Sequence, residues 1–157
     1  MAVEFVAQWL HIIVSIFWFG SVMFGDFVLM PAIAKMTPAG QRDFGVHVGS
    51  RIPRIMTPVA ILSIGLGVIR GVAFGDIGSL DQLFGTAYGL TWLLALVAAV
   101  ATFSWRMWVV APTLDGMSKV ATPAEASAAA GRLRSLVMIE LVGFLVVFTT
   151  MIAMHFE

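Results

Sequence analysis

The stretch FVAQWLHIIVSIFWFGSVMFGDFVLMPAIA, residues 5–34, decides the fold. His11 and Asp26 are its only titratable side chains. An α-helix rises about 1.5 Å per residue, so about 20 apolar residues cross the hydrocarbon core of a bilayer. The stretch has no basic leader and no small-residue cleavage site, and it is longer than the apolar part of a secretory signal. We therefore expect a retained membrane-spanning helix.

The rest of the chain has the same character. The 157 residues are 60% hydrophobic and only 11% charged, with a mean hydropathy of +0.98. Three more apolar stretches follow, at about 55–74, 86–111 and 134–156. This composition excludes a soluble domain and predicts an all-α integral membrane protein. We expect a single domain over 1–157, an up-down four-helix bundle.

The positions of the basic residues predict the orientation. They cluster in the connections after the first and third stretches, at Lys35, Arg42, Arg51, Arg54, Arg106, Lys119, Arg132 and Arg134. The middle connection, 75–85, carries Asp76 and Asp81 and no base. Because cytoplasmic loops are enriched in Lys and Arg, both basic connections should face the cytoplasm. Both termini would then lie on the outer, periplasmic or extracellular side, and the bacterial cytoplasmic (inner) membrane is the expected location.

Composition also limits the chemistry. The chain has no cysteine, which excludes disulfides and thiolate metal sites, so a metal would need His, Met, carboxylate or backbone ligands. Nine basic and nine acidic residues leave no basic tract for nucleic acid. No nucleophile with a positioned base and no phosphate-binding loop is recognisable. Catalytic residues are thus unknown, and an enzyme of this kind would be a haem-dependent membrane oxidoreductase.

Two histidines and two acids lie at matching depths in the first and fourth spans. His11 and Asp26 are about 22 Å apart along one helix axis, and His155 and Glu140 have the same spacing on a helix running the other way. Helical periodicity places each His–acid pair on one face of its helix. Because ionisable groups in hydrocarbon are costly, both faces should point into the bundle. The imidazoles would lie at the outer level and the carboxylates at the inner level.

Other polar and small residues surround the outer level. Arg70 ends the second span, where it would meet a haem propionate or another anion, and Tyr88 and Trp92 begin the third. Small residues recur every fourth position of the second span, at Ser63, Gly67, Gly71 and Gly75. A flat macrocycle would fit against such a bare face, but the commoner role of this spacing is helix packing. Arg70 would in the alternative extend to the interface.

At the inner level we expect a polar cluster of Asp26, Glu140, Arg54 and Arg106. It has two interpretations, a structural ion network and a route for protons. Met151 and Met154 lie beside His155, and thioethers are soft ligands that suit Cu(I).

Several short motifs resemble known membrane proteins. They are Trp9-Leu10-His11-Ile12-Ile13, Trp18-Phe19-Gly20, Gly67-Val68-Ile69-Arg70-Gly71 and Tyr88-Gly89-Leu90. Together they resemble the membrane domain of copper-resistance D proteins and the related HemJ-type protoporphyrinogen oxidases. The resemblance implies a four-helix membrane fold and a functional histidine in the first helix. In the HemJ-type group this histidine is expected to ligate haem b, and His11 occupies its place in this chain. That group also expects a lysine early in the third helix, where this chain has Thr91, Trp92 and Leu93.

Three functions follow as hypotheses. The first is a b-type haem protein for electron transfer or haem-linked redox chemistry at the outer face, with axial ligands His11 and His155, and with Arg70, Tyr88 and Trp92 around the cofactor. The second is a copper-handling protein with ligands His11, His155, Met151 and Met154. The third is a non-catalytic membrane subunit or small transporter. A membrane haem protein would exchange electrons with a quinone or a redox protein, and exposed glycine faces permit a homo-oligomer.

Overall fold

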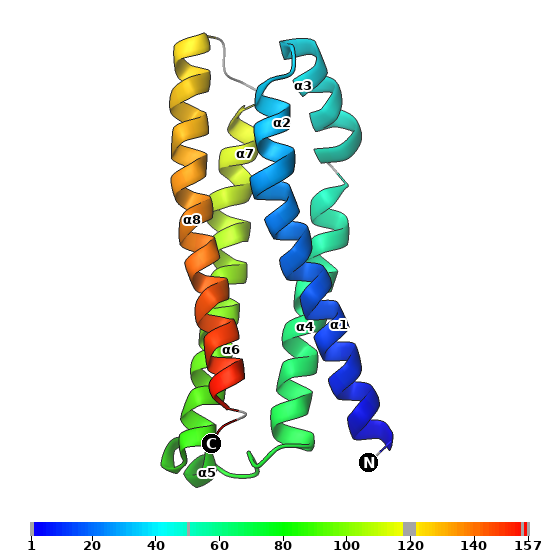
Figure 1. The fold of residues 1–157 in the computed structure, drawn as a ribbon, viewed down its shortest axis with the longest axis vertical. Helices are drawn as coiled ribbons and strands as arrows, with labels where there is room; N and C mark the ends of the chain where they lie inside the picture. The colour runs from blue at the N-terminus through cyan, green and yellow to red at the C-terminus, as the bar shows by residue number, and fades with distance from the viewer. Residues whose placement is uncertain (1, 50, 118–121, 155, 157) are drawn as a thin grey trace.

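The computed structural model describes residues 2–49, 51–117, 122–154 and 156, with the side chains of 38, 42, 49, 117, 123 and 126 left out. Within these ranges every regular element is a helix. Four helical segments are long and apolar enough to cross a membrane: Ala2–Ala34, Ile52–Ala73, Ala87–Gly116 and Ser127–Ala153. The predicted all-α fold is confirmed, and the four long apolar helices are consistent with a four-helix membrane protein (Figure 1).

Two of the four spans change helical winding partway along. The first span consists of α1 (Ala2–Phe24), the π-helical turn η1 (Gly25–Leu29) and α2 (Met30–Ala34). The third consists of α6 (Ala87–Trp105), the π-helical turn η3 (Arg106–Val110) and α7 (Ala111–Met117). The second span is α4 (Ile52–Ala73), and the fourth lies within α8 (Pro123–Ala153). Short helices α3 (Pro38–Phe44), η2 (Gly45–Gly49) and α5 (Leu80–Gly85) lie in the connections.

Side-chain caps fix where the later helices begin. The Thr122 hydroxyl accepts from Glu125 N at 3.3 Å while the Glu125 carboxylate accepts from Thr122 N at 3.2 Å, a reciprocal capping box ahead of α8. The Ser79 hydroxyl accepts from Gln82 N at 3.2 Å and starts α5. Both caps agree with their sequence signatures, and they orient the polypeptide as it enters the last two spans.

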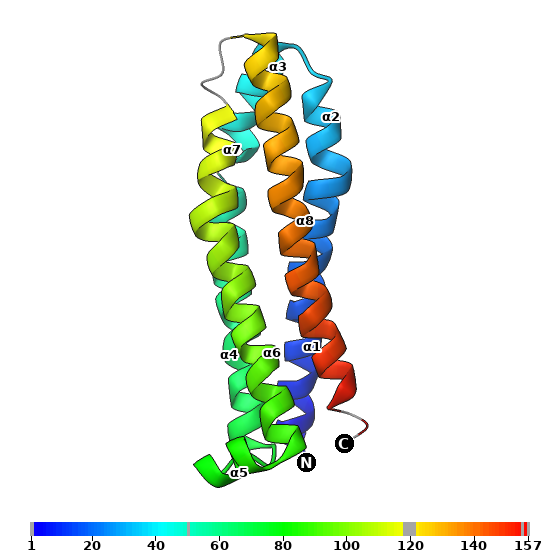
Figure 2. The same ribbon diagram turned by 90° about the vertical axis from the view of Figure 1, so that its left-hand side faces the viewer.

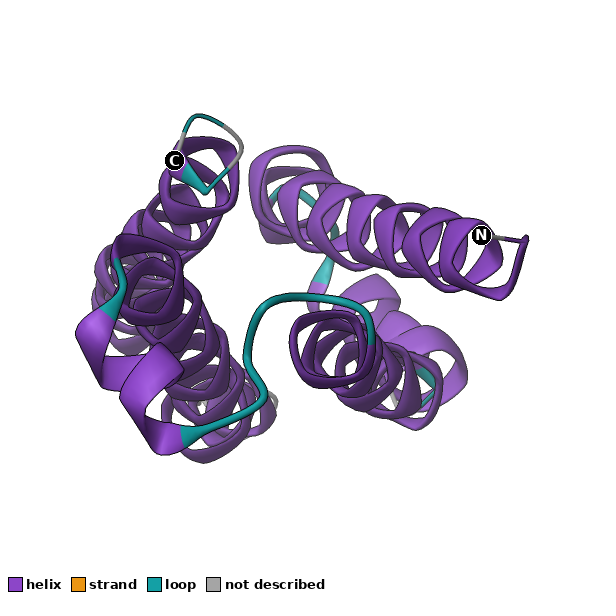
Figure 3. Ribbon diagram, turned by 90° about the horizontal axis from the view of Figure 1, so that it is seen from below, coloured by secondary structure: helices purple, strands orange, loops and turns teal. Residues whose placement is uncertain are grey.

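The bundle consists of two closely packed helix pairs. The most extensive contacts are those of α1 with α4 and of α6 with α8, while α4 and α6 touch less (Figures 2 and 3). In the second pair Gly143 lets α8 approach α6, because a Cβ there would overlap the Thr102 hydroxyl. The first and fourth spans are neighbours across the seam between the pairs.

Burial follows the pattern of a protein dissolved in lipid. Large apolar side chains such as Phe17, Ile61 and Val142 are more than half exposed on the bundle surface. Polar side chains, in contrast, lie inside: His11, Ser63, Thr102, Glu140 and Thr150 are all buried. The interior of the bundle is therefore the place to look for function.

Candidate functional site

A cavity of about 400 Å³ opens between the two helix pairs near the end of the bundle that carries the start of α1 and the end of α8. All four spans contribute to its wall. The volume lies within the range of about 300–1,000 Å³ that is usual for small-molecule and cofactor sites. Its lining is mostly apolar, with a few polar groups that include His11, Arg70 and Tyr88.

His11 is buried in this wall, and its ring is held in one orientation by helix α4. The imidazole Nδ1 lies 3.0 Å from the Ser63 backbone oxygen, to which it donates. The Nε2 nitrogen then carries the lone pair. An Nδ1–H bond to a backbone carbonyl is the usual way in which a metal-ligating histidine is oriented. Beside this bond, the Ser15 and Ser63 hydroxyls lie 2.7 Å apart.

The small-residue ladder of α4, with Gly75 just beyond the end of that helix, is filled by rings from other helices. A Cβ on Gly67 would lie 3.1 Å from His11 Cε1, a Cβ on Gly71 would overlap the Trp92 indole, and a Cβ on Gly75 would lie 2.6 Å from the Tyr88 hydroxyl. The Trp92 Nε1–H also donates to the Gly67 oxygen at 3.4 Å. The ladder is therefore a packing face, and a macrocycle in the cavity would contact these rings rather than bare α4.

Arg70 lies at the edge of the cavity. Its Nε donates to Gln8 Oε1 at 2.8 Å, and its Nη2 lies 4.0 Å from Glu4 Oε1. The side chain is about one-third exposed, which suits a cation at the membrane interface. Gln8 was not among the sequence candidates, although it stands one turn before His11.

The fourth span supplies the wall opposite α4. Met151 and Met154 line the cavity together with Phe144, Val147 and Phe148. His155, the predicted partner of His11, lies outside the described residues, so the expected pairing of two histidines stays a prediction. Of the sequence candidates within the described part of the chain, His11, Arg70, Tyr88, Trp92, Met151 and Met154 all contribute to this one cavity.

An aromatic layer closes the inner end of the cavity. The Trp18 ring meets Phe144 edge-on at a centroid distance of 5.0 Å, and Phe19 meets Phe144 at 5.4 Å and Phe148 at 4.7 Å. Phe103 adds a further edge contact to Trp18 at 6.4 Å. We call these five rings, Trp18, Phe19, Phe103, Phe144 and Phe148, the aromatic layer. It joins the first span to the third and fourth, and it forms one hydrophobic cluster with Val22 and Ala60.

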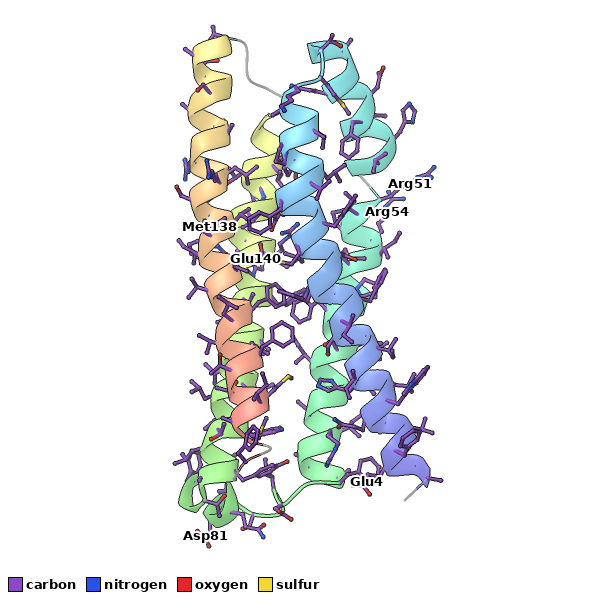
Figure 4. All side chains as sticks on the ribbon, in the orientation of Figure 1. Glu4, Arg51, Arg54, Asp81, Met138 and Glu140 are labelled. Atoms are coloured by element: carbon purple, nitrogen blue, oxygen red, sulfur yellow. The ribbon has the colours of Figure 1, made fainter. Side chains whose placement is uncertain are left out.

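Beyond the aromatic layer lies a charged triad of Asp26, Arg106 and Glu140. Arg106 Nη1 donates to Glu140 Oε2 at 2.8 Å and approaches Asp26 Oδ1 at 3.5 Å. The Asp26 and Glu140 side chains are only 4% and 1% exposed. Figure 4 shows Glu140 on the side of α8 that faces the other helices, whereas Arg54 on α4 and Arg51 just before it point away from the bundle. The structure thus brings together three members of the predicted inner cluster and leaves Arg54 exposed.

The sequence signal for these two sites was their helical periodicity. His11, Trp18 and Val22 are buried on the inward face of α1, and Phe144 and Glu140 are buried on that of α8. The inward orientation of both His–acid faces is therefore confirmed for the described residues. The role of the Ser63 carbonyl was not predicted, because every residue has a backbone carbonyl and the sequence does not indicate which one accepts from a side chain.

Comparison of this chain with protein-family models, with curated protein sequences and with solved structures found no match.

Proposed function

We propose that this chain is an integral membrane b-type haem-binding protein in which His11 is an axial ligand and the cavity holds the cofactor. The observation that carries the proposal is the buried His11 ring, which lines the cavity with its Nδ1 engaged by the Ser63 oxygen. That bond leaves Nε2 as the nitrogen for iron. When bound, haem would supply one-electron redox chemistry.

The surrounding residues fit such a ligand. The wall is largely apolar, and Trp92 and Tyr88 present flat rings held against α4. Arg70 at the edge has the geometry to receive a propionate while it keeps its bond to Gln8. On the opposite wall, Met151 offers a thioether, and His with Met is an established axial pair for haem iron. His155, which the sequence predicts as the second ligand, lies outside the described residues and stays the predicted partner of His11.

A second candidate is a copper-handling protein, favoured by the thioethers of Met151 and Met154 in the same cavity as His11. One imidazole with two thioethers is a soft ligand set that suits Cu(I). The resemblance to copper-resistance D proteins also favours this candidate.

Under either proposal, we place the chain in a bacterial cytoplasmic membrane with both termini outward, because the basic connections should face the cytoplasm. A quinone or a redox protein would be the electron partner of the proposed haem protein.

The first experiment is an optical spectrum of the detergent-purified protein, air-oxidised and then reduced with dithionite, combined with elemental analysis for iron and copper. Haem gives a Soret band, with sharp α and β bands on reduction if it is low-spin. Copper without a Soret band would select the second candidate. Absence of both would leave a non-catalytic subunit or small transporter.

The residue assignment has a matched control. His11→Ala should abolish the haem or copper signal, whereas His47→Ala should leave it unchanged, because His47 is exposed on η2. Retention of full haem content in His11→Ala would refute His11 as the ligand. His155→Ala and Met151→Leu, compared by the position of the reduced bands, would identify the second ligand.

A further inference from the structure

The charged triad plays no part in the proposed haem or copper site, and its charges do not balance. Two carboxyl groups, Asp26 and Glu140, face a single guanidinium, Arg106. If all three were ionised, one negative charge would remain in excess within a span. An unpaired charge inside a membrane costs roughly several kcal/mol, so it is normally neutralised.

Among the side chains that the structure describes, no other cation is paired with the triad. Lys35 on the connection after α2, Arg54 on α4, and Arg132 and Arg134 on α8 are all exposed. Arg106 is the one cation that the described ion pairs bring to Asp26 and Glu140. Among the described residues no group of three or more His, Asp or Glu side chains is arranged to hold a metal ion. These observations favour a proton as the neutralising ligand.

Two carboxylate oxygens provide independent evidence for that ligand. Asp26 Oδ2 and Glu140 Oε1 are buried, and neither has a hydrogen-bond partner among the residues that the structure describes. An ionised carboxylate oxygen requires a donor, and leaving it unmet is unfavourable. A proton bound there removes the excess charge and turns one unpaired acceptor into a hydroxyl donor.

The distances indicate which carboxyl group carries the proton. Arg106 Nη1 lies 2.8 Å from Glu140 Oε2 but 3.5 Å from Asp26 Oδ1. The closer pair has the length of a charge-assisted hydrogen bond, while the longer one is at the limit of hydrogen bonding. We infer that Asp26, Arg106 and Glu140 form a binding site for one proton, which Asp26 carries while Glu140 remains ionised beside Arg106.

The local backbone is also unusual at this site. Asp26 lies in the π-helical turn η1, and Arg106 is the first residue of the π-helical turn η3. Single π-helical turns within α-helices occur frequently at functional sites. Here two such turns from different spans bring their charged side chains to the same point.

The aromatic layer separates the proton site from the cavity. Trp18 and Phe144 belong to the cavity wall and to the cluster with Val22, four residues before Asp26. Of the triad, Arg106 is the most exposed, at 23%. The inferred proton site therefore does not depend on whether the cavity binds haem or copper.

Infrared spectroscopy of the purified protein in lipid nanodiscs at neutral pH tests the inference. We expect a carbonyl stretch of a protonated carboxylic acid that shifts in D₂O, because exposed acids are ionised at this pH. Asp26→Asn should remove the band. Glu140→Gln should also remove it, since Asp26 would then be the only carboxylate left to pair with Arg106. Arg106→Gln should increase it by about twofold, because both acids would then be protonated.

Asp81→Asn, a change at an exposed acid on α5, is the control and should leave the band unchanged. No protonated-carboxyl band in the wild-type protein would overturn the inference without any variant. A band that survives in both Asp26→Asn and Glu140→Gln would overturn it as well. Loss of the wild-type band on adding Na⁺ would do the same, by assigning the site to a metal cation.

Discussion

At the scale of the residue, the position of His11 depends on a backbone oxygen and on a glycine, not on another side chain. The ring is held by the backbone oxygen of Ser63 and lies against Gly67, where a Cβ would come within 3.1 Å of it. The Ser63 carbonyl and the missing Cβ of Gly67 together define the orientation of the imidazole. Substitutions in α4 should therefore affect His11 according to the space they fill.

A graded glycine series tests this. Gly71→Ala should destabilise most, because its Cβ would overlap the Trp92 indole, and Gly67→Ala should cost about 1–3 kcal/mol through contact with His11. Gly65→Ala is the matched control, since nothing lies within 4 Å of its added Cβ. Thermal unfolding in detergent, followed by circular dichroism, gives the order. Equal effects at all three positions would show that helix propensity, and not ring packing, dominates.

Ser63→Ala separates the two roles of that residue. The hydroxyl bond with Ser15 would be lost, at a cost of about 1 kcal/mol, while the backbone oxygen that binds His11 would remain. We therefore expect slightly lower thermal stability and, if the proposed haem is bound, an unchanged optical spectrum. A changed spectrum would mean that the Ser63 hydroxyl also contributes to the ligand site.

At the scale of the element, the π-helical turns are the feature that distinguishes the first and third spans from ordinary helices. A π turn contains one more residue than the α turn it replaces. Deleting Val28, an exposed residue within η1, should convert the turn to regular α-helix and preserve the facing of the residues on both sides. The variant should still fold, with a lower unfolding temperature from disturbance near Asp26.

Deleting Ile16 provides the comparison. Ile16 is 58% exposed and Val28 is 55% exposed, so lost burial is matched. Ile16, however, lies in continuous α-helix, and its removal rotates His11 by about 100° relative to Trp18. We expect a much larger loss of stability and cofactor in this variant, measured by circular dichroism and absorption. If both deletions lowered stability equally, η1 would not contain the extra residue expected of a π-helical turn.

How much of this could be predicted from sequence varies by element. Hydropathy was sufficient for the four spans, and the periodicity of His11, Trp18 and Asp26 was sufficient for the inward face of the first. The capping box at Thr122 was readable because it is local. The π turns at Gly25–Leu29 and Arg106–Val110 were not predicted from the sequence. The choice of Arg106 over Arg54 depends on how helices rotate after they pack.

At the scale of the whole molecule, the orientation in the membrane is testable because the chain has no cysteine. Asp81 on α5 and Lys35 directly after α2 are both exposed, and α5 and the end of α2 lie near opposite ends of the bundle (Figure 1). The single replacements Asp81→Cys and Lys35→Cys therefore report on the two ends. With the basic connections inside, a membrane-impermeant maleimide should label Asp81→Cys in intact cells and Lys35→Cys only after permeabilisation. The reverse pattern would invert the predicted topology.

The division of the bundle into two helix pairs has a consequence for assembly. One connection, residues 74–86, which includes α5, joins the α1–α4 pair to the α6–α8 pair. His11 and Asp26 come from the first pair, whereas Met151, Arg106 and Glu140 come from the second. Expressed as two polypeptides, 1–77 and 78–157, each half would be a helical hairpin with an incomplete cavity and an incomplete triad. Binding of the proposed cofactor would then report directly on the reunion of the two fragments, as complementation does in split reporter proteins.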